Sequence, residues 1–182
     1  LDMRMNQSGD LTAAKVVNTY EEHQLIRIFR NFGELSNARK VAGELVNKRS
    51  ERKIKTTQDL MDVLRFCAPR HKEHKFFAQV FQALRIEVNN ELDVLEKFLI
   101  QSAEVLSPGG RLVVMSYHSL EDRLVKNFMK RGAVDGEITK DFFGNILKPF
   151  DEIVRHPIVP SEEELELNSR ARSAKLRIAE KR

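Results

Sequence analysis

The sequence contains a single cysteine, Cys67, among its 182 residues. One cysteine excludes an internal disulfide and a zinc site built from cysteine ligands, and it fits a reducing compartment. Cys67 follows Leu60 and Leu64 at helical spacing, so we expect a buried apolar thiol rather than a reactive one.

A long apolar run is also missing. No stretch approaches the roughly 18 residues that a membrane-spanning helix requires, and no signal peptide opens the chain. We therefore expect a cytoplasmic protein with no membrane partner. Lys and Arg outnumber Asp and Glu by 31 to 27, a small excess that suits a partner carrying phosphates but is common among soluble proteins. Because Leu1 is not an initiator residue, we expect a fragment of a longer chain.

Helical periodicity dominates the first half of the sequence. An apolar stripe from Leu25 to Phe32 predicts one helix, and a second apolar pattern begins after Ser36, which we expect to be its N-cap. Thr56 and Asp59 have the spacing of a capping box and predict a third helix. These helices are more numerous than one crossover connection needs, so we expect an inserted helical lobe.

The second half predicts one long helix over residues 77–106, followed by a Pro-Gly-Gly turn. Residues 111–116 predict a strand, buried as parallel α/β sheets require, and residues 151–155 and 173–179 predict two more. A helix that leads into a buried strand is the second half of a crossover unit, which predicts an α/β sheet whose earlier strands precede residue 1. Such a sheet exposes an unpaired edge, so association into a homodimer is one expectation.

Polar side chains follow the strand predicted over residues 111–116. Ser116, His118, Ser119, Asp122 and Arg123 lie where ligands bind in open α/β sheets, beyond the carboxyl ends of the strands. His118 can exchange a proton or stack on a base. Ser119 and Asp122 are alternatively explained as a helix N-cap and its reciprocal partner. A hydrolase triad of Ser119, His118 and Asp122 is disfavoured, because neighbours at a helix start rarely converge in that geometry.

Further candidates lie near the start of the chain and on the long helix. Asp2 and Arg4 form either a salt-bridged turn or part of a pocket rim. Arg85 and Asn89 lie one helical turn apart and can hydrogen-bond a ligand together, although such pairs are also common on helix surfaces.

Two basic segments are candidates for contacts with phosphates. Arg170 and Arg172 precede the last predicted strand, where they either bind phosphates or pair with the acidic run at residues 162–166. The basic loop at residues 70–75 is either a solvated surface, which we favour, or a contact to an RNA backbone. Its two histidines have no carboxylate or further histidine partners nearby, so we expect no metal site.

Five ordered segments together resemble one known family. They are LDMRM at residues 1–5, FQALRIEVNNEL at 81–92, GGRL at 109–112, SYHSLEDR at 116–123 and RARSAKLR at 170–177. Over essentially the whole chain they are similar to the bacterial 16S ribosomal RNA cytosine-N4 methyltransferases, the MraW/RsmH family. Three positions depart mildly from the family pattern: Tyr117 stands where Phe is expected, Ser169 where Pro is expected and Asn6 where Asp is common.

The resemblance implies an incomplete Rossmann-like methyltransferase sheet with an inserted all-helical lobe. Residues 1–14 would end the amino-terminal half, residues 15–80 would form the substrate-recognition lobe, and residues 81–182 would complete the methyltransferase domain. The implied reaction transfers a methyl group from S-adenosyl-L-methionine to N4 of a decoding-region cytidine in 16S rRNA, within the small ribosomal subunit. The family's cofactor motifs would lie upstream of Leu1, so no residue here is assigned to the cofactor and the fragment alone is expected to be inactive.

The resemblance also suggests roles for the candidate residues. Asp2 or His118 would accept a hydrogen bond from N4. The remaining candidates are expected to bind the RNA substrate: Arg4, Arg85, Asn89, Ser116, Ser119, Arg123, Arg170 and Arg172. The alternative is a helical RNA- or protein-binding module at residues 15–80 with no enzymatic role.

Overall fold

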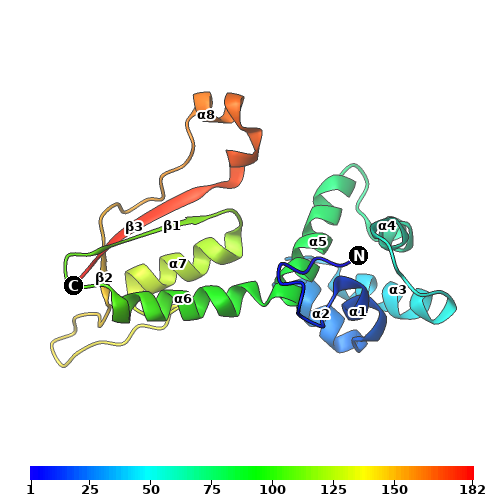
Figure 1. Cartoon of the computed structure of the whole chain (residues 1–182), viewed down its shortest axis with the longest axis horizontal. Coiled ribbons are helices and arrows are strands. Elements are labelled where there is room, and N and C mark those ends of the chain that lie inside the picture. The colour runs from blue at the N-terminus through cyan, green and yellow to red at the C-terminus, as the bar shows by residue number, and fades with distance from the viewer. The chain divides into compact units, whose positions relative to one another are not determined.

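A computed structural model describes all 182 residues. The chain divides into two compact units, Leu1–Glu91 and Leu92–Arg182 (Figure 1). The first contains α1 (Ala13–Thr19), α2 (Glu22–Asn31), α3 (Ala38–Glu51), α4 (Thr57–Leu64), the 3₁₀ turn η1 (Arg65–Cys67) and α5 (Glu73–Asn89). The second contains α6 (Glu91–Val105), β1 (Arg111–Ser116), α7 (Ser119–Arg131), β2 (Phe150–Glu152), α8 (Glu162–Leu167), η2 (Ser169–Ser173) and β3 (Lys175–Lys181). No helix is both long and apolar enough to span a membrane.

The first unit packs its helices around one core of nineteen buried residues, Cys67 among them. The capping box of Thr56 and Asp59 is confirmed at the start of α4. The predicted N-cap of α3 is wrong, because Asn37 and not Ser36 occupies that position, and its side chain makes no capping hydrogen bond. Gly33 follows α2 where any larger residue would collide, since a Cβ there would lie 2.9 Å from the carbonyl oxygens of Phe29 and Gln79. Glycine therefore lets α2 end against α5.

The single helix predicted over residues 77–106 is wrong, because the chain breaks it at Asn90. Asn90 has a left-handed backbone with φ 52°, and its N–H donates to the carbonyl oxygens of Ile86 and Glu87 to close α5. Asparagine tolerates this conformation better than most residues. The apolar periodicity continues across the break because the helices on both sides bury apolar residues, so the pattern alone cannot reveal it.

The second unit holds a three-stranded antiparallel sheet of order β1-β3-β2. Both α6 and α7 contribute to a core of seven buried residues, with Leu112 of β1 and Ala179 of β3 paired in register within it. The predicted bounds of β1 are confirmed, whereas its burial on both faces is wrong: Val113 and Met115 are each 53% exposed. The sheet is apolar on both faces, and β1 pairs with a strand on one side only.

Candidate functional site

Asn89 fastens the amino-terminal segment to the last turn of α5. Its Nδ2 donates to the carbonyl oxygen of Met3 at 2.8 Å, and its Oδ1 accepts from the N–H of Met5 at 2.7 Å. A second Nδ2 contact goes to the carbonyl oxygen of Arg85, also at 2.8 Å. The whole side-chain amide is thereby engaged, and Met3 is held at φ 68°. Two segments 84 residues apart in sequence are joined by one side chain.

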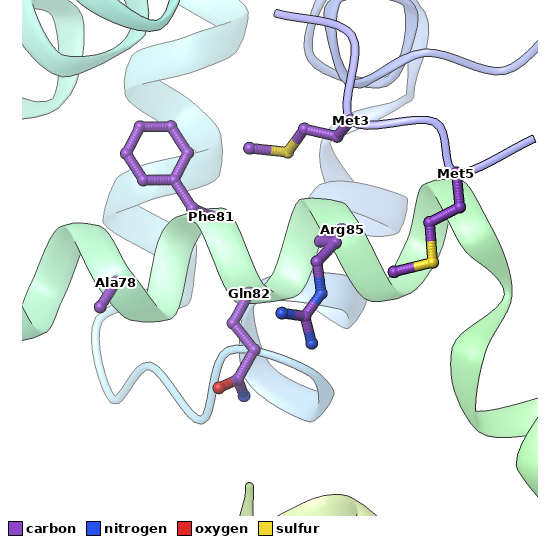
Figure 2. A pocket seen from close by; sticks show the side chains of 6 residues that line it. All are labelled: Met3, Met5, Ala78, Phe81, Gln82 and Arg85. Carbon is purple, nitrogen blue, oxygen red and sulfur yellow. The ribbon is translucent and has the colours of Figure 1, made fainter. Parts of the chain in front are cut away.

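A pocket of about 350 Å³ lies between that segment and α5. Its lining is Met3, Met5, Ala78, Phe81, Gln82 and Arg85. The α5 residues follow one another at helical spacing and so share a face, while Met3 lies across from Phe81 and Met5 lies on the Arg85 side (Figure 2). An apolar cleft of this size with few polar groups is typical of a small-ligand site. Thioether and aromatic surfaces suit a flat ring.

Arg85 and Gln82 are the two polar side chains that line this pocket. Arg85 forms a bidentate ion pair with Glu91, at 2.8 and 3.0 Å, which fixes the plane of its guanidinium. Gln82 donates through Nε2 to the carbonyl oxygen of Phe32 at 2.8 Å. Sequence reasoning identified Arg85 and Asn89 but missed Met3, Met5, Phe81 and Gln82. The only sequence feature that could have identified them is that they lie in, or next to, the family-like segments at residues 1–5 and 81–92.

Asp2 and Arg4 form the salt-bridged turn that was one of the two sequence interpretations. The Arg4 guanidinium donates Nε to Asp2 Oδ1 at 2.6 Å and Nη2 to Oδ2 at 2.8 Å. Its Nη1 also donates to the carbonyl oxygens of Gln7 and Gly9. The hydrogen bond from Arg4 lowers the pKa of Asp2 to about 2, so this carboxylate stays ionised. Neither residue lines the pocket, but both flank Met3 in sequence.

The polar cluster after β1 belongs to the second unit. His118, not Ser119, is the N-cap of α7, so the predicted capping pair of Ser119 and Asp122 is wrong. His118 Nδ1 accepts from the N–H of Glu121 at 3.4 Å, and the Glu121 carboxylate accepts from the N–H groups of Tyr117 and His118. Burial alone would raise the pKa of Glu121, but the His118 side chain, whose Nε2 lies 3.3 Å from Glu121 Oε1, together with these backbone donors outweighs it and lowers the pKa. Histidine was missed as the cap because its ring rarely fills that position.

Asp122 instead connects α7 to β3. Its carboxylate accepts from Arg177 Nε at 2.7 Å and from Lys175 Nζ at 3.3 Å, and both Asp122 and Arg177 are buried. Burial tends to raise the pKa of Asp122, but the two cations outweigh it and lower the pKa. The carboxylate therefore orients Arg177 rather than His118, and no hydrolase triad is assembled.

The other candidates are dispersed over the second unit. Ser116 is buried, and its Oγ donates to the carbonyl oxygen of Lys175 at 3.4 Å. Ser119 is the first residue of α7, and Arg123 is exposed one turn later. Arg170 and Arg172 are exposed on η2. The turn between β1 and α7 consists of Tyr117 and His118 and contains no glycine.

Comparison with known proteins adds a family to this geometry. The chain matches the MraW methylase family over residues 1–182. It is 55% identical over 182 residues to ribosomal RNA small subunit methyltransferase H of Flavobacterium psychrophilum, of which it covers 62%. Proteins of the same name from Amoebophilus asiaticus and Bacteroides fragilis are 54% and 53% identical, and the chain covers 58% and 60% of them. In each case all of this chain is matched, so it spans about three-fifths of these relatives' length.

Proposed function

The chain belongs to the MraW methylase family, and from that membership we propose that it is part of an enzyme that methylates ribosomal RNA. The enzyme would transfer the methyl group of S-adenosyl-L-methionine to the N4 amine of a cytidine in the decoding region of 16S rRNA. The observation that carries this proposal is the pocket between the amino-terminal segment and α5, built from two of the segments that mark the family. The names of the relatives support the rRNA substrate.

The complete fold is proposed to be a Rossmann-like methyltransferase domain with residues 15–80 inserted as a recognition lobe. The second unit supports this, because its sheet is apolar on both faces and one edge of β1 lacks a strand partner. Sheets covered on both sides have this composition, and doubly wound sheets often carry antiparallel strands at one margin. The small sheet would be such a margin.

The chemistry explains why a shaped pocket is needed. The exocyclic amine of cytosine is conjugated to its ring and is a poor nucleophile, so the enzyme has to accept its N–H bonds and hold it in line with the methyl group. The base must also leave its stack and enter the site. In the proposed arrangement Met3 and Phe81 flank the ring, and Arg85, oriented by Glu91, donates to a carbonyl or phosphate oxygen of the substrate.

Asp2 and His118 are the two proposed acceptors for the N4 hydrogen bond. Because His118 Nδ1 accepts from the N–H of Glu121, a neutral ring carries its proton on Nε2 and donates there instead of accepting. The Asp2 carboxylate stays ionised and has lone pairs beyond those used by Arg4. Asp2 therefore suits the accepting role better, because His118 Nε2 is buried and lies 3.3 Å from Glu121 Oε1, so the ring is directed at Glu121. Arg4, Arg123, Arg170 and Arg172 remain proposed phosphate contacts, with Ser116, Ser119 and Asn89 supporting the substrate side.

The cofactor would supply the methyl group from a part of the enzyme that these residues do not provide. The residues of this chain would bind the RNA, orient the base and exclude water around the amine. A helical binding module with no enzymatic role is the second candidate, favoured by the self-contained helical core of the first unit.

A methyl-transfer assay separates these two candidates. The protein from the complete gene would be incubated with labelled S-adenosylmethionine and small ribosomal subunits that lack the modification, and the nucleosides identified by mass spectrometry. We expect N4-methylcytidine, and we expect Arg85→Met to lower kcat/KM by about 10- to 100-fold through loss of substrate positioning. Arg30→Met, at an exposed position on α2, is the matched control. RNA binding without methyl transfer, or methylation at another atom, would contradict the proposal.

A further inference from the structure

One exposed aromatic ring in the first unit has no role in its core or its pocket. Among the large hydrophobic side chains of this unit only Met5 and Phe66 are exposed, at 71% and 85%. Met5 lines the pocket beside Arg85. Phe66 lies in neither the core nor the pocket, although its neighbours Leu64 and Cys67 are both buried. The Phe66 ring is therefore exposed although Leu64, two residues before it, and Cys67, directly after it, are buried.

The backbone around Phe66 is fixed, so the outward position of its ring is a built feature. Phe66 lies in the 3₁₀ turn η1, which closes with the N–H of Ala68 donating to the carbonyl oxygen of Arg65 at 3.2 Å. The carbonyl oxygen of Phe66 accepts from Lys40 Nζ at 3.0 Å, and that of Cys67 accepts from Asn37 Nδ2 at 2.8 Å. Both donors belong to α3 or its N-cap. A ring presented on an anchored turn loses little entropy when it binds a partner.

Basic residues are concentrated in the sequence around this ring. The stretch from residue 65 to residue 75 holds four Lys or Arg residues and one acidic residue, and all of these charged side chains are exposed. Lys40 adds a further ammonium group at the carbonyl oxygen of Phe66. Arg65 pairs only with Asp62, at 3.1 Å, and both side chains are largely exposed. Exposed pairs of this kind are weak, so Arg65 can exchange its carboxylate partner for a phosphate at small cost.

We propose that Phe66 is a stacking platform for an unpaired base of the RNA substrate, with Lys40, Arg65, Arg70 and Lys72 holding the phosphates on either side. A basic groove combined with an outward aromatic ring is the arrangement by which proteins bind unpaired nucleic acid. Folded RNA exposes such bases in loops and bulges. This inference rests on the proposed rRNA substrate, and it makes the face around η1 a second contact, separate from the pocket.

The observations favour RNA over the other classes of partner. A membrane anchor needs a broad apolar face, whereas Phe66 is a single exposed ring in a segment rich in basic residues. A protein interface needs an apolar centre depleted of charge, and this surface is the opposite.

The absence of tryptophan from the sequence allows a direct test on the 182-residue chain. Phe66→Trp introduces one tryptophan, and its fluorescence should be quenched when an unpaired oligoribonucleotide of about 12 nucleotides binds. Phe142→Trp, at another exposed phenylalanine in the second unit, is the matched control and should not be quenched. Quenching at both positions, or at neither, would overturn the platform.

Affinity provides the second measurement. Phe66→Leu keeps an apolar side chain but removes the ring, and we expect about a tenfold or greater loss of affinity for the unpaired RNA, with Phe66→Trp close to wild type. Phe142→Leu should bind as wild type does. Unchanged binding by Phe66→Leu, or binding to anionic lipid vesicles instead of RNA, would overturn the platform. The outcome of the binding measurements is separate from that of the methyl-transfer assay. Failure of the methyl-transfer assay would contradict the proposed enzymatic function, whereas the binding measurements test only the role of Phe66.

Discussion

The two units have equal lengths and very different surfaces. The first buries nineteen residues in its core and exposes two large hydrophobic side chains, whereas the second buries seven and exposes fifteen. Soluble domains seldom expose apolar patches that extensive unless a partner covers them. The first unit therefore buries most of its large apolar side chains, whereas the second leaves many of its own exposed.

The cause of this difference is the type of structure in each unit. Helices connected by short loops close around one core, and each needs only one apolar face. The sheet of the second unit has apolar residues on both faces, and β1 has one unpaired edge. The residues of this unit therefore leave part of the apolar sheet surface and one row of backbone groups of β1 without a partner.

The largest expected effect is on the buried ion pair of the second unit. Asp122→Asn leaves Arg177 buried without its counter-charge, which should lower the free energy of unfolding by about 3 kcal/mol. We expect the second unit to unfold first, in a separate step of a urea titration followed by circular dichroism. Asp151→Asn removes a carboxylate paired only at the surface and should change stability much less. Equal effects of the two substitutions would contradict this account of Asp122.

The same carboxylate should make the second unit sensitive to acid. The pKa of Asp122 is lowered in the folded state, so its contribution is fully present above the pKa of an unfolded aspartate. That contribution is lost as the pH falls through the lowered pKa of the folded state. Unfolding titrations over this acid range should show the difference between wild type and Asp122→Asn shrink as the pH falls. A difference that is constant with pH would show that the charge of Asp122 is not what stabilises the unit.

Predictability from the sequence also differs between the units. Local signals predicted β1 with its bounds, β3 with bounds two residues too early, and the capping box at Thr56, because each depends on residues adjacent in the chain. The break at Asn90 was missed because apolar periodicity runs through it. The ion pair between Asp122 and Arg177 joins residues 55 positions apart, a separation that no local pattern reveals.

In the candidate site too, local spacing was predictive and tertiary contacts were not. The spacing of Arg85 and Asn89 placed both on one face of α5, and the structure joins them through a hydrogen bond between the Asn89 side chain and the Arg85 backbone. The pairing of Asn89 with Met3 and Met5 depends on tertiary contact and was missed.

An intermediate effect is expected at this contact in the first unit. Asn89→Ala removes the donor to Met3 and the acceptor for Met5, which should lower the free energy of unfolding by about 1–3 kcal/mol and loosen the pocket. Asn90→Gly is the matched control, since its φ of 52° suits glycine and its side chain makes no comparable contact. Thermal unfolding of both variants measures the difference. Similar losses for the two would show that the end of α5, rather than the Asn89 amide, matters.

The smallest effect on stability is expected on the outward face of β1. Replacing Val113 and Met115 with threonine places β-branched residues at both positions of the strand and should change the free energy of unfolding by about 0.5 kcal/mol or less. Self-association should fall measurably in light scattering if that face is exposed in solution. The same double substitution in the protein from the complete gene should instead destabilise it, because there the face would be covered. If the double substitution changed the stability of both proteins equally little, the proposed difference between the two units would be contradicted.

The Asn89 contact also has a consequence in time. Asn89 is the last residue of α5, and helix ends open and close far faster than a domain unfolds. Each opening of that final turn would release Met3 and Met5 together. The Met3 and Met5 side of the pocket would therefore stay in place only while the last turn of α5 is helical. A bound ring that stabilises this side would also slow the fraying of the helix. The N–H of Met5, on an exposed residue, would then exchange its hydrogen at a rate set by the occupancy of the pocket.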